Sequence, residues 1–247
     1  MRSAPVLLAC ALAVTGLTVT AQPAHAATFP ACQHFYPGPI PDRPVTGGTA
    51  PGSLTPPVSV DTRLPAPGGV SGGVSGSSVV FTFNRVPGAV AYRAFRNGQA
   101  LQWISDWGQP TLTVTDANPC ADANYQLYAM SEASGSEPSI GQVSTAYRVG
   151  GSGQLAPYAL AKGSTLTYRV TSYNDSGQTA LGYHAGPGFC AVDVRNIPWG
   201  TRFFVPGYGN CYAADIGSWI KDDIVDVWLP GTQADSWGIQ RQTLVVE

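Results

Sequence analysis

The chain has 247 residues, enough for two small domains, and carries a net charge of −2 with only 11% charged residues. It has no cluster of lysines and arginines, which argues against nucleic acid or an anionic membrane surface as a partner. Its 29 glycines and 21 prolines suit short strands joined by many turns, so we expect a mostly β protein.

The N-terminus has the pattern of a targeting segment. Arg2 precedes an apolar stretch over residues 5–19, and Ala24-His25-Ala26 forms a small-x-small cleavage site. We predict a signal peptide over 1–26 and a protein that is secreted, extracellular or associated with the cell wall. A lipoprotein anchored through Cys10 is the alternative, but few apolar residues precede that cysteine. No other stretch approaches the roughly 20 apolar residues of a membrane span.

Residues 27–58 are rich in proline, glycine and threonine and predict a weakly structured lead-in. Short alternating strands are then expected within a domain over 59–150, at Val79–Phe83, Ala91–Arg96, Thr111–Thr115, Tyr125–Ala129 and Val143–Tyr147. Asn97-Gly98 supplies a hairpin turn. Such a series of strands indicates a β-sandwich.

Two tryptophans of this domain, Trp103 and Trp107, have two open interpretations. They pack inside the sandwich, or they form a face that stacks on sugar rings. After them, Gly150-Gly151-Ser152-Gly153 opens a segment, 151–165, that we predict to be a linker.

The last region, 166–247, is organised by three aspartates. Asp193, Asp215 and Asp226 each lie in or beside a short apolar run. A carboxylate in such a run is costly to bury unless it is paired, hydrogen-bonded or protonated, so three of them require an explanation.

The elements around these aspartates occur in a characteristic order. They are Ala191-Val192-Asp193, Ile197-Pro198-Trp199-Gly200-Thr201, Val205-Pro206-Gly207-Tyr208-Gly209, Ala213-Ala214-Asp215, Ile220-Lys221 and Ile224-Val225-Asp226. This order resembles the three-aspartate (3D) domain of bacterial cell-wall enzymes. The resemblance implies a double-psi β-barrel, the fold of membrane-bound lytic transglycosylases and of stationary-phase survival proteins.

The preceding domain has a resemblance of its own. Val86-Pro87-Gly88-Ala89, Tyr92-Arg93 and Arg96-Asn97-Gly98 are similar to bacterial fibronectin type III modules. The predicted fold is therefore all-β, with a fibronectin type III-like β-sandwich followed by a double-psi β-barrel.

The 3D resemblance implies cleavage of a glycosidic bond in peptidoglycan by a lytic transglycosylase-type mechanism, with Asp226 as general acid and base. A general acid needs a pKa raised above the ordinary value of about 3.9. The apolar neighbours of Asp226 supply desolvation, and Asp215 supplies a second carboxylate if the barrel brings it close.

Other residues have supporting roles in this hypothesis. Asp193 either holds a turn or joins the catalysis, and Lys221 either neutralises a site carboxylate or is solvated. The candidate substrate-binding residues are Trp219, Tyr208 and Tyr173.

Four cysteines remain after export, and three connectivities are open for two disulfides. Because Cys190 and Cys211 both lie in the 3D-like region, we pair them and assign Cys32 to Cys120. No motif for a metal or a cofactor is present, and we expect neither.

Two hypotheses of different classes remain. The first is an exported, monomeric enzyme whose partner is peptidoglycan or a related glycan. The second is a non-catalytic barrel that binds cell-wall polysaccharide or inhibits a partner protein. The second hypothesis rests on Ile216 and Trp219, which replace a hydroxyl residue and a small residue of the family pattern.

Overall fold

The computed structural model describes residues 29–32, 63–133 and 139–247. Strands dominate the described residues, whose helix, α1 (Thr232–Trp237), is short. The prediction of an all-β protein is confirmed. The predicted signal peptide and most of the lead-in lie outside the described residues.

The first domain is a β-sandwich. One sheet has the order β1-β2-β5, from β1 (Ser71–Ser75), β2 (Ser78–Asn84) and β5 (Thr111–Asp116). The second has the order β4-β3-β6-β8-β9, and its strands are β3 (Ala91–Arg96), β4 (Gln99–Ser105), β6 (Tyr125–Met130), β8 (Ala146–Val149) and β9 (Leu155–Tyr158). A short strand, β7 (Ile140–Val143), also pairs with β6. The predicted turn joins β3 and β4, and its Asn97 and Gly98 have φ angles of 49° and 77°, which a two-residue hairpin of this type requires.

Two sequence-based interpretations of the sandwich are corrected by the structure. Trp103 and Trp107 are 44% and 87% exposed, so they do not pack inside the sandwich. The predicted linker, 151–165, contains β9, which pairs antiparallel with β8 and extends the second sheet. The resemblance of the sandwich to fibronectin type III modules stays a prediction.

The second domain is a closed six-stranded barrel with the order β10-β14-β11-β13-β12-β15. Its strands are β10 (Thr165–Tyr173), β11 (Phe189–Val192), β12 (Arg202–Val205), β13 (Gly209–Asp215), β14 (Ile224–Trp228) and β15 (Gln240–Val246). In β14, Val225 and Val227 are fully buried in the barrel core. Because side chains alternate along a strand, the intervening Asp226 lies on the outer face of the barrel.

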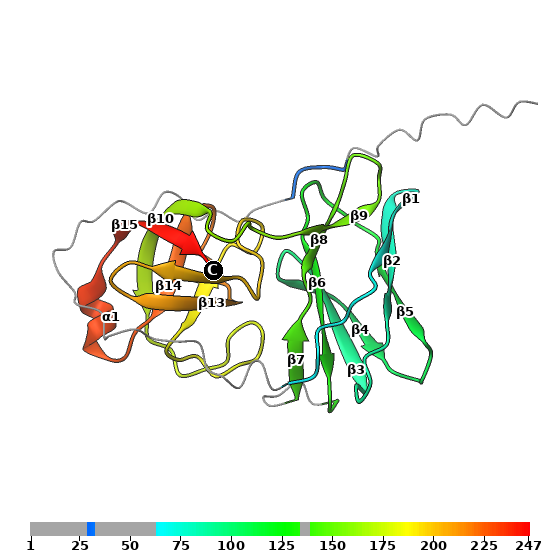
Figure 1. Ribbon diagram of the computed structural model, residues 1–247, viewed down its shortest axis with the longest axis horizontal. Coiled ribbons are helices and arrows are strands. Elements are labelled where there is room, and N and C mark those ends of the chain that lie inside the picture. Colours follow the sequence, from blue (N-terminus) through cyan, green and yellow to red (C-terminus); the bar gives the residue numbers. More distant parts are fainter. Residues whose placement is uncertain (1–28, 33–62, 134–138) are drawn as a thin grey trace, which may run out of the picture.

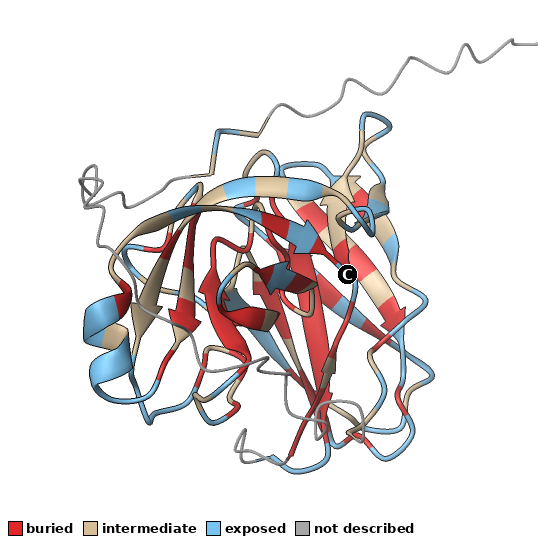
Figure 2. Ribbon diagram, turned by 60° about the vertical axis from the view of Figure 1, so that its left-hand side comes forward, coloured by how far each residue is buried: buried red, intermediate tan, exposed pale blue. Residues whose placement is uncertain are grey.

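The two domains lie side by side (Figure 1). The sandwich has a core of its own, and the core cluster of the barrel extends into the sandwich through residues of β3, β6 and β7. Strand β6 is buried along its whole length, since one face packs into the sandwich and the other packs against the barrel. Figure 2 shows that buried segments are concentrated in the centre of the molecule.

Trp199 of the barrel anchors this contact between the domains. Its ring meets Phe95 of β3 edge-on, with 5.2 Å between the ring centroids. Gln126 of β6 donates from Nε2 to the carbonyl of Trp199 at 2.9 Å and accepts from its N–H at 3.1 Å. Packing and paired hydrogen bonds together fix the barrel against the sandwich.

Two disulfides join Cys32 to Cys120 and Cys190 to Cys211, which confirms the predicted pairing. The first ties the described piece of the lead-in to the sandwich, and the second lies within the barrel. Among the described residues, no helix has the length and apolar character to cross a membrane.

Candidate functional site

A row of four side chains crosses the outer face of the barrel. In the strand register, Thr171 of β10 lies opposite Asp226 of β14, Asp226 lies opposite Ala191 of β11, and Ala191 lies opposite Asp215 of β13. Because neighbouring strands are about 4.8 Å apart, the two aspartates lie roughly 10 Å apart along the row. Between the two aspartates, the Ala191 side chain is 4% exposed and packs with Ile220 and Ile224.

Asp226 has the environment of a general acid. Burial raises its pKa to about 6, and the negative charge of Asp215 acts in the same direction. The hydroxyl of Thr171 donates to Oδ1 of Asp226 at 2.7 Å and opposes this increase. Beside the carboxylate, Ile220 and Ile224 form a small buried cluster with Ala191. The group can therefore exchange a proton in mildly acidic to neutral solution.

Asp215 is held in one orientation by backbone N–H groups. Its Oδ1 accepts from Ala180 at 2.8 Å and from Ile216 at 2.9 Å. Burial raises the pKa of Asp215, those two hydrogen bonds lower it, and the charge of Asp175 raises it again. This arrangement provides a fixed carboxylate in the same row as Asp226, and its role in catalysis stays a prediction.

Tyr173 lies two residues after Thr171 and points to the same face of the sheet. Its hydroxyl is buried and makes no hydrogen bond within the described part of the chain. Burial raises the pKa of Tyr173, and the charges of Asp215 and Asp226 raise it further, so the phenol stays protonated. A buried hydroxyl without a partner is uncommon and marks this part of the barrel as a candidate site, and the substrate-binding role of Tyr173 stays a prediction.

Asp193 lies outside this row and holds a turn. Its carboxylate forms an ion pair with Arg195 and accepts the backbone N–H of Asp222 at 2.9 Å. Asp222 has a φ of 53°, a left-handed conformation that is uncommon outside glycine, and this hydrogen bond helps to hold it. Burial raises the pKa of Asp193, while the N–H groups of Asp222 and Arg195 lower it. These contacts favour the structural interpretation over the catalytic one.

Comparison with known protein families identifies the C-terminal region. The model of the 3D domain matches residues 189–247. The C-terminal part of the chain is a 3D domain. All three aspartates lie inside the matched residues, whereas β10, which supplies Thr171 and Tyr173 and closes the barrel, precedes them.

Two relatives come from Bacillus subtilis (strain 168). The cell wall-binding protein YocH is 37% identical over 91 residues, which cover 33% of this chain and 32% of YocH. The putative cell wall shaping protein YabE is 38% identical over 80 residues, which cover 30% of this chain and 20% of YabE. The chain therefore spans about a third or less of these relatives. No solved structure matches it.

The remaining predicted residues of the 3D domain have different surroundings. Tyr208 is 1% exposed, accepts the N–H of Gly188 at 3.0 Å and packs its ring edge-on against Trp237, so a glycan cannot reach it. Trp219 is 50% exposed and presents its ring to solvent. Lys221 donates to the carbonyls of Gly217 and Ile220 at 2.8 and 3.3 Å and thereby closes the loop that carries Trp219.

Sequence reasoning missed Thr171 and the backbone groups that hold Asp215. Thr171 lies 55 residues from Asp226, and only the parallel pairing of β10 with β14 places its hydroxyl on the carboxylate. The sequence carries no signal for this register. Across the described ranges of the chain, no group of three or more His, Cys, Asp or Glu side chains is arranged to hold a metal ion.

Proposed function

We propose that this protein is exported to the cell wall and cleaves a glycosidic bond of peptidoglycan, with Asp226 as the general acid. The observation that carries the proposal is the carboxyl group of Asp226, whose pKa is about 6 and which lies on the barrel's outer face in one row with a second carboxylate. The two disulfides suit an oxidising compartment outside the cytoplasm. The printed names of YocH and YabE also support a role at the cell wall.

In the proposed reaction, protonated Asp226 donates its proton to the glycosidic oxygen as the carbon–oxygen bond breaks. The Asp226 carboxylate then accepts a proton from the hydroxyl that attacks the anomeric carbon. If that hydroxyl belongs to the same sugar, the product has a 1,6-anhydro end, as the family resemblance implies. If it belongs to water, the product has a reducing end.

Asp215 has a separate part in this proposal. Its two backbone hydrogen bonds favour the ionised form, and a carboxylate in this position stabilises the positive charge that develops on the sugar ring. The charge of Asp215 also helps to keep the proton on Asp226 before the reaction.

The test is incubation of the mature protein with purified peptidoglycan and mass spectrometry of the soluble products. We expect muropeptides with anhydro ends. Products with reducing ends would support glycosidase activity but would rule out the transglycosylase mechanism. If no muropeptide is released while a control enzyme is active on the same material, the catalytic proposal is wrong.

A non-catalytic, glycan-binding barrel is the second candidate, and the exposure of Trp219 favours it. Ile216 is also 37% exposed, so the loop after Asp215 presents two apolar side chains to solvent. An exposed indole ring can stack on a sugar. Peptidoglycan pull-down that is lost in Trp219→Ala and retained in Gln233→Ala, a change on the exposed surface of α1, without turnover in the wild type, would support this candidate instead.

A further inference from the structure

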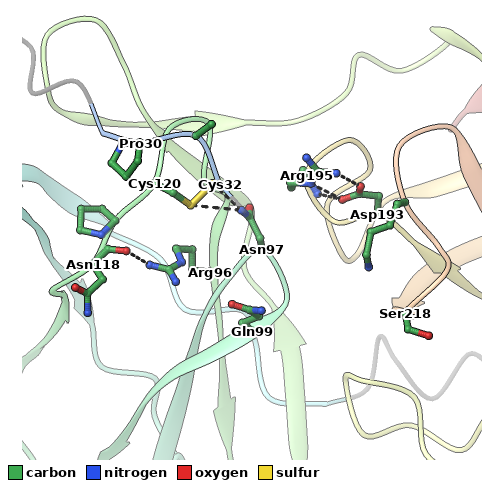
Figure 3. Close-up of a pocket in the computed structure, with 13 residues that line it drawn as sticks. Pro30, Cys32, Arg96, Asn97, Gln99, Asn118, Cys120, Asp193, Arg195 and Ser218 are labelled. Atoms are coloured by element: carbon green, nitrogen blue, oxygen red, sulfur yellow. Dashed lines mark hydrogen bonds and ion pairs between the residues drawn. A yellow bond between two sulfur atoms is a disulfide. The ribbon is translucent and has the colours of Figure 1, made fainter. Parts of the chain in front are cut away.

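A cleft of about 590 Å³ lies between the sandwich and the 3D domain (Figure 3). Its sandwich side is formed by the hairpin of β3 and β4, by residues 118–120 and by the described piece of the lead-in. Its barrel side is formed by Asp193, Arg195, Ser218 and Lys221. Neither Asp215 nor Asp226 lines it. The volume falls within the roughly 300–1,000 Å³ that is common for ligand pockets.

Cationic side chains outnumber carboxylates in the lining of the cleft. Three cations, Arg96, Arg195 and Lys221, face it together with one carboxylate, Asp193. Arg195 is already paired with that carboxylate and with Asp222, and Arg96 is paired with Asp116. Lys221 is the lining cation that has no ion pair within the described residues. Arg96 uses its Nη1 for Asp116 and for the carbonyl of Asn118, and its Nε and Nη2 have no further partner in the described part of the chain. These two N–H groups can take up a carboxylate.

Neutral hydrogen-bonding groups line both sides of the same cleft. The carboxamides of Gln99 and Asn118 and the hydroxyl of Ser218 are exposed, and these side chains form no hydrogen bond within the described residues. In Figure 3, Gln99 and Asn118 belong to the sandwich, and Ser218 lies on the barrel side. A carboxamide donates and accepts at once, so it matches the amide groups of a peptide chain. Inorganic phosphate, by contrast, would be bound by the cations and would make no use of the carboxamides.

We infer that this cleft binds a short peptide that carries a free carboxylate, such as the stem peptide of peptidoglycan. This inference rests on the proposed role at the cell wall. The loop 216–223 connects the two sites, because Ser218 and Lys221 line the cleft while Ile220 packs beside the Asp226 row. A peptide held in the cleft therefore contacts the same loop that packs beside the Asp226 row.

The inference is tested by titrating a soluble stem tetrapeptide into the mature, isotope-labelled chain and following amide shifts by nuclear magnetic resonance. We expect shifts at residues of the cleft and weaker binding at high salt. Gln99→Glu and Ser218→Asp each place a negative charge in the cleft, and each should raise Kd about tenfold. Gln233→Glu makes the same chemical change on α1, outside the cleft, and should leave Kd unchanged.

Two further probes identify the group that is recognised. The tetrapeptide with its carboxylates methylated should bind at least tenfold more weakly, and inorganic phosphate should not compete. Equal binding of the methylated peptide, competition by phosphate, or an unchanged Kd in both cleft variants would each overturn the inference. Binding is measured without turnover, so a protein that binds the peptide but releases no muropeptide would remove the catalytic proposal and retain this one.

Discussion

Replacing Asp226 with asparagine should make the fold more stable at pH 7 while it removes the proposed acid. The pKa of Asp226 is about 6 in the fold, against an ordinary value of 3.8. At about 1.36 kcal/mol per unit of pKa, ionising this group at pH 7 costs the fold at most about 3 kcal/mol. Asparagine cannot ionise, and its side-chain oxygen can still accept the hydrogen bond from Thr171. We therefore expect the free energy of unfolding to rise by about 2–3 kcal/mol.

The expected gain depends on pH in a defined way. Below the ordinary pKa of 3.8 the carboxyl group is protonated in the folded and unfolded chains, so wild type and Asp226→Asn should be equally stable. Between 3.8 and about 6 the wild type loses stability relative to the variant as pH rises, and above about 6 the difference is constant. Over the same range the variant should release muropeptides about 10²-fold more slowly or worse.

The assay compares urea unfolding of both proteins at pH 3.5 and pH 7, alongside muropeptide release. Asp235→Asn, an exposed carboxylate of α1, is the control and should change neither quantity. An Asp226→Asn variant less stable than the wild type at pH 7 would show that Asp226 is held in its ionised form. Full muropeptide release by this variant would remove the acid assignment.

Three other predictions concern the aspartate row, the turn at Asp193 and the contact between the domains. Muropeptide release should fall as pH rises through about 6, because Asp226 loses its proton there. In Asp215→Asn this fall should occur at lower pH, because the negative charge that raises the pKa of Asp226 has been removed. Asp193→Ala leaves a partly buried arginine without its main counter-ion and should cost about 3 kcal/mol in urea unfolding; an unchanged midpoint would contradict the structural role. Gln126→Ala leaves the backbone N–H and carbonyl of Trp199 without partners between the domains and should cost about 2 kcal/mol or more, and a calorimetric scan that keeps the wild-type Tm would refute it.

Much of the barrel could be predicted from the sequence because its signals are local. Asp226 stands between pairs of apolar residues, which indicates desolvation before any fold is known. The turn-like surroundings of Asp193 indicated a carboxylate that accepts backbone N–H groups, and the structure has those contacts. The ordered motifs across 189–247 and the shared position of Cys190 and Cys211 predicted the 3D domain and its disulfide, and both are confirmed.

The tertiary structure alone decided which side chains meet across strands that are distant in the sequence. Tyr208 was predicted to bind substrate. The closed barrel instead buries it in the core, where its ring packs against Trp237. Thr171 was not predicted, since its contact with Asp226 depends on the register of β10 against β14. The site and the interdomain cleft therefore depend on strand register and on how the two domains pack. Strand register and domain packing are determined by contacts between residues far apart in the sequence, which local sequence patterns do not encode.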